Sequence, residues 1–377
     1  MAHVKVKVDS MVNFCHEVFQ KFGFTAEESK IITDVLVLSD IYGIESHGAQ
    51  RLVRYHKGIE SGMIKVHAKP EIIQETPVSA VVDGHEGMGQ LIGHYCMELA
   101  IQKAKTAGIG MVSARESNHY GIAGYYAKLA SDQGLIGISA TNSEAIVVPT
   151  FGKKAMLGTN PVAFAMPADP YPFFFDAATS IVTRGKFEMY NKAEEPVPRM
   201  WGTDEKGDPC TDAGHVLNNI KNRAGGGISP LGGVDQVYGS HKGYGNAMVV
   251  ELFTAILSGG LTSNHVMVDG HGGTCHFFMA IDPAIFGDPQ EMVKHLSTFM
   301  TELRESPKRD GKKQIFTHGE KEILAYANRM KYGFDVDVKT LEEMKDCADF
   351  VGVDFYKYFG YLGMKVMFNA EEHDSQY

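Results

Sequence analysis

The sequence predicts an α/β protein, because segments typical of strands alternate with segments typical of helices through the middle of the chain. Residues 78–83 (VSAVVD) have strand character, and residues 89–107 follow with helical periodicity that ends before Gly108. Residues 109–114 (IGMVSA) then return to strand character. A strand, a helix and a second strand in this order are typical of a βαβ unit.

The alternation continues to about residue 178. A helix is expected over 125–133, and it ends at Gly134. Three further strands are expected, each rich in the β-branched and aromatic residues that suit a buried sheet: 135–141, 161–167 and 173–178. This middle part of the chain therefore predicts the sheet domain.

The two ends of the chain have helical periodicity instead. Apolar residues recur three or four positions apart up to about residue 65, and again in 321–330 and 338–352. With 377 residues, of which 44% are hydrophobic, the chain is long enough for two packed domains. We expect a helical domain made of residues 1–78 and 316–377, and an α/β domain made of residues 79–315.

The composition argues against several classes of partner. The formal charge is −10, and the 36 Lys and Arg residues are scattered instead of forming a basic stripe, which argues against nucleic acid. No run of about 18 apolar residues occurs, so no membrane span is expected. The five cysteines are widely spaced, odd in number and without a C-x-x-C pair, which is typical of reduced thiols in a cytoplasmic protein.

A glycine-rich stretch after the first strand is close to a dinucleotide-binding fingerprint. Gly87, Gly89 and Gly93 have nearly the required spacing, and Glu116 follows at about the distance of the usual acidic residue. In that motif the first glycine follows the strand at once, whereas residues 84–86 intervene here. We therefore favour a loop that leads into a helix, with a dinucleotide-sensing protein without turnover as the alternative.

Residues 45–55 contain the first candidate site. On a continuous helix His47, Arg51 and Tyr55 would share one face, because they are four residues apart. Arginine can hold a carboxylate by two parallel hydrogen bonds, and histidine can accept a hydroxyl proton as a hydride leaves. Ser46 could orient the imidazole. These residues suit a small anionic 2-hydroxy acid; the alternative is a helix cap at Ser46 followed by a solvated face.

Two further segments lie where an open α/β sheet usually binds a ligand. His119 lies between an expected strand and an expected helix, and it is a candidate base or cofactor contact. The alternative is a histidine that bonds backbone groups of its loop. Lys242 lies near a glycine-bounded helix start and could neutralise a cofactor phosphate.

A cluster of potential metal ligands follows later in the chain. It consists of His265, Asp269, His271, Cys275 and His276. The spacing matches neither H-E-x-x-H nor paired C-x-x-C motifs, so we expect loop histidines and no metal site. A metal-dependent hydrolase is the alternative that this cluster leaves open.

Taken together, these segments resemble the type 2 malate/L-lactate dehydrogenases. The resemblance covers nearly the whole chain and is carried by SHGAQR (46–51), ESNHYGIAGYYA (116–127), VVPTFGKKAMLGTNPVAFAMP (147–167), FDAATS (175–180) and HKGYG (241–245). It implies a fold distinct from the Rossmann fold, with a mixed-sheet cofactor domain and a helical domain that carries part of the substrate site. It also implies NAD(P)-dependent reduction of 2-oxo or imino acids, and a homodimer with sites near the subunit boundary.

The family's functional residues can be matched one by one. Its catalytic residues match Ser46, His47, Arg51 and His119, with either histidine as the base. The expected substrate contacts are Arg51, Tyr55 and Thr159. The expected cofactor contacts are His119, Tyr120, Gly121, Ile122, Ala123, Asp176, Ala177, Ala178, His241, Lys242, Gly319 and Glu320. The chain departs from the family at Thr317 and His318, which precede Gly319 where members usually have a proline-glycine-glutamate turn.

We therefore predict an NAD-dependent malate dehydrogenase, with NADP as the other possible cofactor. The alternatives within the same chemistry are lactate, sulfolactate, ureidoglycolate or a cyclic imino acid as the substrate. The alternatives from other classes are the dinucleotide-sensing protein and the metal-dependent hydrolase described above.

Overall fold

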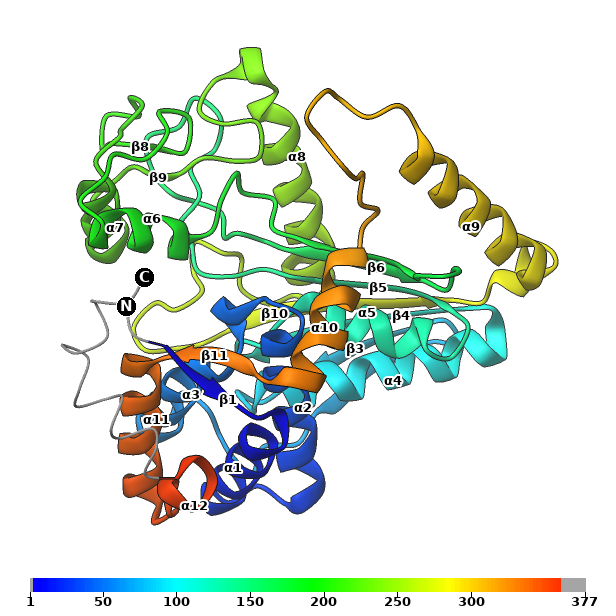
Figure 1. The fold of residues 1–377 in the computed structure, drawn as a ribbon, viewed down its shortest axis with the longest axis horizontal. Coiled ribbons are helices and arrows are strands. Elements are labelled where there is room, and N and C mark those ends of the chain that lie inside the picture. The colour runs from blue at the N-terminus through cyan, green and yellow to red at the C-terminus, as the bar shows by residue number, and fades with distance from the viewer. Residues whose placement is uncertain (1–2, 361–377) are drawn as a thin grey trace. The chain divides into compact units, whose positions relative to one another are not determined.

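The computed structural model describes residues 3–360, and the chain forms two compact units (Figure 1). The first unit comprises Met1–His67 with Met300–Tyr377, and the second comprises Ala68–Phe299. No helix among residues 3–360 is both long enough and apolar enough to cross a membrane.

The first unit is mainly helical. Its elements are β1 (His3–Val6), α1 (Val8–Lys21), α2 (Ala26–Ile41), the 3-10 turns η1 (Glu45–His47) and η2 (Ala49–Arg51), α3 (Leu52–Glu60), α10 (Glu320–Tyr332), β11 (Phe334–Asp337), α11 (Val338–Val351) and α12 (Phe355–Phe359). Helix α2 begins with a capping box, in which Thr25 and Glu28 satisfy each other's backbone N–H groups. Antiparallel pairing of β1 with β11 joins the two ends of the chain. Phe14 packs edge-on against Phe355 and extends this junction into the core.

The second unit contains a mixed seven-stranded sheet in the order β2-β3-β4-β10-β5-β6-β7. The strands are β2 (Glu71–Glu75), β3 (Ser79–Asp83), β4 (Ile109–Ser117), β5 (Ile136–Thr141), β6 (Val162–Met166), β7 (Phe173–Ala177) and β10 (Thr274–Ile281). Among these neighbours β3 and β4 alone are parallel, and α4 (Gly89–Ala107) joins them. The predicted βαβ unit and the five predicted strands are confirmed.

Helices cover both faces of this sheet (Figure 1). Successive side chains of a strand point to opposite faces, and β10 shows the consequence. Phe278 packs against Tyr126 of α5 (Ala123–Ser131), at 5.4 Å between ring centroids. Phe277 packs against Phe253 in the π-helical turn that follows α8 (Ser240–Glu251), at 4.7 Å. The central strand is therefore buried on both faces.

The remaining elements of the second unit form a smaller cluster and a peripheral helix. The cluster contains α6 (Arg184–Lys192), β8 (Gly202–Thr203), α7 (Ala213–Asn222) and β9 (Gly227–Ile228), and the 3-10 turn η3 (Gln236–Tyr238) leads into α8. Its core is formed by Phe187, Val216 and Ile228. Another 3-10 turn, η5 (Pro283–Ile285), leads to α9 (Pro289–Glu305).

Candidate functional site

The residues Ser46, His47 and Arg51 lie on two short 3-10 turns, so the prediction of one continuous helix over this segment is wrong. The turns η1 and η2 are separated by Gly48, and α3 begins only at Leu52. The carboxylate of Asp40 accepts the N–H of Ala49 at 2.8 Å. A Cβ atom at position 48 would lie 1.8 Å from that carboxylate. A tertiary contact that requires glycine therefore replaces the expected helical turn.

The three side chains are nevertheless brought together. Ser46 Oγ is hydrogen-bonded to His47 Nδ1 at 2.9 Å, and Arg51 Nε donates to the Ser46 carbonyl at 2.5 Å. Burial lowers the pKa of His47 to about 4, with further lowering by the charges of Arg51 and Arg54. At neutral pH His47 is therefore an uncharged imidazole, the form that can accept a proton. Tyr55 is fully buried in α3.

A second layer of contacts supports this segment from α10. Arg329 donates to the backbone carbonyl of Asp40 at 2.6 Å and to the carboxylate of Glu45 at 2.7 Å. Burial raises the pKa of Asp40 to about 7; the Ala49 N–H opposes this effect, and the charge of Glu45 adds to it. The C-terminal part of the first unit thus holds the turn that presents His47.

In the second unit, His119–Ala123 connects β4 to α5. The N–H of Gly121 donates to His119 Nδ1 at 3.4 Å, so the neutral form of His119 carries its proton on Nε2. Gly121 has a φ of +85°, which favours glycine. Asp176 of β7 accepts the N–H of Gly124 at 2.7 Å, near the start of α5. This bond brings two of the predicted cofactor segments, 119–123 and 176–178, to the same place.

An aromatic stack lies beside this connection. The ring of His276 is parallel to that of Tyr120, at 4.3 Å between centroids, and Tyr120 stacks in turn on Tyr126. His276 Nε2 bonds Ser117 Oγ at 2.8 Å, and burial lowers the pKa of His276 to about 3. The expectation of a loop histidine is wrong for His276, because it is a buried residue of β10. The pattern TCHFFMAI (274–281) is the strand signal that the sequence analysis missed.

Thr159 lies beside the segment that contains Asp176–Ala178. Its carbonyl accepts hydrogen bonds from the backbone N–H and the hydroxyl of Thr179, at 2.9 and 3.0 Å. Its own N–H donates to Ser143 Oγ at 3.1 Å. The next residue, Asn160, donates to the buried carboxylate of Glu251 at 2.8 Å. Asn160 lies in the segment 147–167 that carries the family resemblance, whereas no local pattern indicated Ser143 or Glu251.

The N-terminus of α8 carries His241 and Lys242, both exposed. The N–H of Leu231 donates to the Thr179 carbonyl at 2.8 Å. Gly243 packs so tightly on Leu231 that a Cβ atom there would lie 2.2 Å from the Leu231 carbonyl oxygen. The start of α8 is therefore linked to the segment that follows Asp176–Ala178.

Gly319 and Glu320 belong to the first unit, at the start of α10. Glu320 is buried and accepts hydrogen bonds from Gln314 Nε2 at 2.8 Å and from the Thr317 N–H at 3.2 Å. Gly319 has a φ of +96°. These contacts fix the turn that leads into α10. Thr317, where the chain departs from the family's usual turn, is one of the residues that make them.

The glycines of the rejected fingerprint have a packing role. A Cβ atom at Gly89 would lie 2.2 Å from the Asn118 carbonyl oxygen and 2.5 Å from that of His119. Gly93 similarly leaves room for Tyr126. The start of α4 is therefore packed against the His119 segment, as expected of a loop that leads into a helix.

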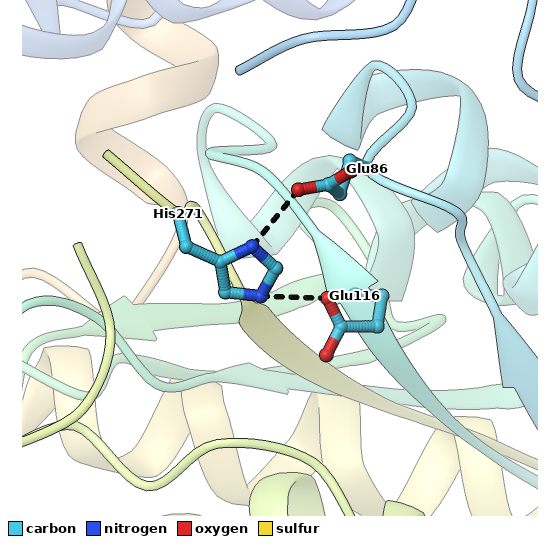
Figure 2. Close-up of side chains that lie close together, drawn as sticks. All are labelled: Glu86, Glu116 and His271. Atoms are coloured by element: carbon cyan, nitrogen blue, oxygen red, sulfur yellow. Dashed lines mark hydrogen bonds and ion pairs between the residues drawn. The ribbon is translucent and has the colours of Figure 1, made fainter. Parts of the chain in front are cut away.

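His271 lies in a loop, as predicted, but it is not isolated. Its Nδ1 and Nε2 atoms each lie 2.8 Å from a carboxylate oxygen, of Glu86 and Glu116 respectively (Figure 2). Cys275 lies in β10, and His265 is exposed and bonds Thr262. Among residues 3–360, the potential ligands that come close enough to share an ion are His271, Glu86 and Glu116, and none of the other four candidates belongs to this group.

Comparison with known proteins identifies the family to which this chain belongs. The family model described as malate/L-lactate dehydrogenase matches residues 6–345. The chain belongs to the malate/L-lactate dehydrogenase family. Among its relatives, a malate dehydrogenase of Pyrococcus horikoshii is 43% identical, covering 93% of this chain and 97% of that protein. An L-sulfolactate dehydrogenase of Methanocaldococcus jannaschii is 35% identical, covering 91% of this chain and 96% of that protein.

Solved structures give the same answer for the fold of this dehydrogenase. The crystal structure of malate dehydrogenase from Entamoeba histolytica matches with a TM-score of 0.89 and 39% identity, over 93% of this chain and 99% of that chain. The structure of malate dehydrogenase from Pyrococcus horikoshii OT3 matches with a TM-score of 0.86 and 42% identity, over 93% and 97%. The predicted family, fold and enzyme class are confirmed. This dehydrogenase is an oxidoreductase of small hydroxy acids that uses a nicotinamide dinucleotide.

Proposed function

We propose that this dehydrogenase interconverts malate and oxaloacetate with NAD. The observation that carries the proposal is the arrangement of Ser46, His47 and Arg51, in which an uncharged imidazole lies beside a guanidinium. The similarity to malate dehydrogenases at 43% identity supports the choice of acid.

The proposed roles follow from the chemistry of the side chains. Arg51 binds the C1 carboxylate of the substrate, and Tyr55 and Thr159 are further substrate contacts. His47 accepts the hydroxyl proton during malate oxidation, because it is uncharged at neutral pH and Ser46 fixes its ring. His119 is the second candidate for this role.

The donor set of the second unit fits a dinucleotide. The N–H groups in the first turn of a helix have no partner within the helix, and the positive end of the helix dipole favours a phosphate. Helix α8 adds the exposed Lys242 at this end. A Cβ atom at Gly245 would have no other atom within 4 Å, so the space beside Gly245 is open to a ligand. We propose that His241 and Lys242 hold the pyrophosphate. The other proposed cofactor contacts are His119–Ala123, Asp176–Ala178, Gly319 and Glu320.

When bound, the cofactor supplies the hydride chemistry. The chain's own residues bind the acid, orient it and move the proton.

We also propose a homodimer, which is supported by an apolar stripe on α8 and the following turn: Met248, Val249, Leu252, Phe253, Ile256 and Leu257 are all exposed. The five free cysteines support a reducing compartment such as the cytoplasm.

The test is the loss of NADH absorbance when purified enzyme receives oxaloacetate, pyruvate, sulfopyruvate or a cyclic imino acid, with NADPH in parallel. We expect the highest kcat/KM with oxaloacetate and NADH. A preference for another acid would retain the chemistry and reject malate. A preference for NADPH would reject NAD.

A further inference from the structure

Two loops and a strand of the second unit meet at His271. One loop carries His271 toward β10, the second carries Glu86 between β3 and α4, and Glu116 lies near the end of strand β4 (Figure 2). Both ring nitrogens of His271 lie 2.8 Å from carboxylate oxygens. His271 Nδ1 is hydrogen-bonded to the Glu86 carboxylate, and Nε2 faces the carboxylate of Glu116. The imidazole ring of His271 therefore bridges the two glutamates.

Both glutamates lie on unfavourable backbone. Glu86 has a φ of +62° and Glu116 a φ of +48°, in the left-handed region that side chains with a Cβ disfavour. Their backbones are also joined, because the N–H of Glu86 donates to the Glu116 carbonyl at 2.7 Å. Such conformations persist only where the surrounding contacts hold them. The bonds to His271 are contacts of this kind.

The same loops fix the residue that precedes His119. Asn118 Nδ2 donates to the carbonyls of Glu86 and Gly87, both at 3.0 Å. Gly272, next to His271, lies so close to Asn118 that a Cβ atom there would be 2.6 Å from its side-chain oxygen. A shift of either loop, or of the end of β4, would therefore reach His119.

Other charged groups near this cluster have partners of their own. Arg115 precedes Glu116 and bonds Asp83 at 3.0 Å. His85 precedes Glu86 and bonds Glu71 at 2.9 Å, with Asp83 at 3.3 Å. On the His271 loop, Asp269 is exposed. His85 thus helps to hold the loop that carries Glu86.

We propose that His271 is a positioning residue: by bridging Glu86 and Glu116, it fixes the His119 segment in the place that hydride transfer requires. This proposal rests on the role of His119 in the proposed function. The ligand atoms of Glu86, Glu116 and His271 lie within 4.8 Å of one another, a spacing that a divalent cation could also use.

The first test is the kinetics of His271→Asn across pH, with oxaloacetate and NADH. We expect kcat to fall about tenfold or more with little change in KM, because a misplaced catalytic group lowers the rate of the chemical step. His271→Lys keeps N–H donors that can bond to carboxylates, so it should restore part of kcat. His265→Asn is the matched control and should retain the wild-type kcat. Wild-type kcat and pH profile in His271→Asn would overturn the proposal.

A second variant covers the case in which His271→Asn does not fold. Glu116→Gln removes one anion of the cluster but keeps a hydrogen-bond acceptor, and we expect the same loss of kcat with the same KM. In a double-mutant cycle, adding His271→Asn to Glu116→Gln should cost little more than either change alone. Fully additive losses of kcat in the two variants would contradict the proposal that His271 and Glu116 act together.

The contacts of His271 can also be measured without turnover. The ring-nitrogen NMR shifts of His271, assigned by their loss in His271→Asn, should change in Glu116→Gln, because Nε2 lies 2.8 Å from that carboxylate. Unchanged shifts would overturn the proposal, as would stoichiometric zinc in purified enzyme that His271→Asn loses. If no acid is turned over, the proposed function fails, and this spectrum still tests the cluster.

Discussion

Arg51 has two tasks in the first unit. Its Nε bonds the Ser46 carbonyl, and Ser46 in turn bonds His47. In the proposed function its guanidinium also binds the substrate carboxylate. A lysine would keep the charge but lose the planar fork that both tasks use.

Arg51→Lys should therefore weaken catalysis strongly. Hydrogen bonds to charged groups contribute roughly 1.5–3 kcal/mol, so we expect kcat/KM to fall about tenfold or more, mainly through KM. Arg54→Lys is the matched control, because Arg54 lies on α3 nearby and has no proposed substrate contact. Equal kinetics of wild type and Arg51→Lys would exclude the bidentate role.

Asp40 is a buried carboxyl group with a pKa raised to about 7, whereas its ordinary value is 3.8. The folded state binds its proton more tightly than the unfolded state does. Its contribution to stability is therefore complete at acid pH and is lost as the pH rises through about 7.

Asp40→Asn mimics the protonated group and keeps an acceptor for the Ala49 N–H. Relative to wild type, its free energy of unfolding should increase as the pH is raised from 3.8 to about 7 and should then level off. Urea denaturation at several pH values measures this difference. A difference that is constant with pH would contradict the raised pKa.

The start of α4 shows how one element positions another. Gly89 allows the start of α4 to touch the backbone of Asn118 and His119. A Cβ atom at this position would clash with backbone atoms, and no flexible side chain could move to relieve the clash. Gly89→Ala should displace the His119 segment, lower kcat, and destabilise the fold by about 1–3 kcal/mol through overpacking. Gly185→Ala in α6 is the control, since the nearest atom to its Cβ would be 3.8 Å away. Wild-type kcat in Gly89→Ala would show that this contact does not position His119.

At the level of elements, the sequence predicted the strands and helices whose own residues show a clear hydrophobic period. The strands β3 to β7 and helix α4 follow from alternation and periodicity that each segment carries itself. The helical turn is broken at Gly48 because the Asp40 carboxylate bonds the N–H of Ala49, nine residues later. Hydrophobic periodicity does not register such a contact and therefore predicted a helix there. The cluster of Glu86, Glu116 and His271 joins residues up to 185 positions apart, and no spacing rule could indicate it.

At the level of the whole molecule, the apolar stripe on α8 predicts the oligomeric state. Ile256→Glu would place a charge among exposed apolar side chains, and we expect it to convert the proposed dimer to a monomer in light scattering after size-exclusion chromatography. Ile73→Glu on the edge strand β2 is the control. A monomeric wild type would reject the homodimer, and a dimeric Ile256→Glu would place its interface elsewhere.

The place of β10 in the sheet has a consequence for synthesis on the ribosome. Its neighbours β4 and β5 are complete by Thr141, but the strand that joins them begins only at Thr274. Until then each neighbour presents an unpaired edge, which is a template for association with another chain. The nascent enzyme therefore passes through a long interval in which two half-sheets need protection, and we expect chains that stop before Thr274 to aggregate.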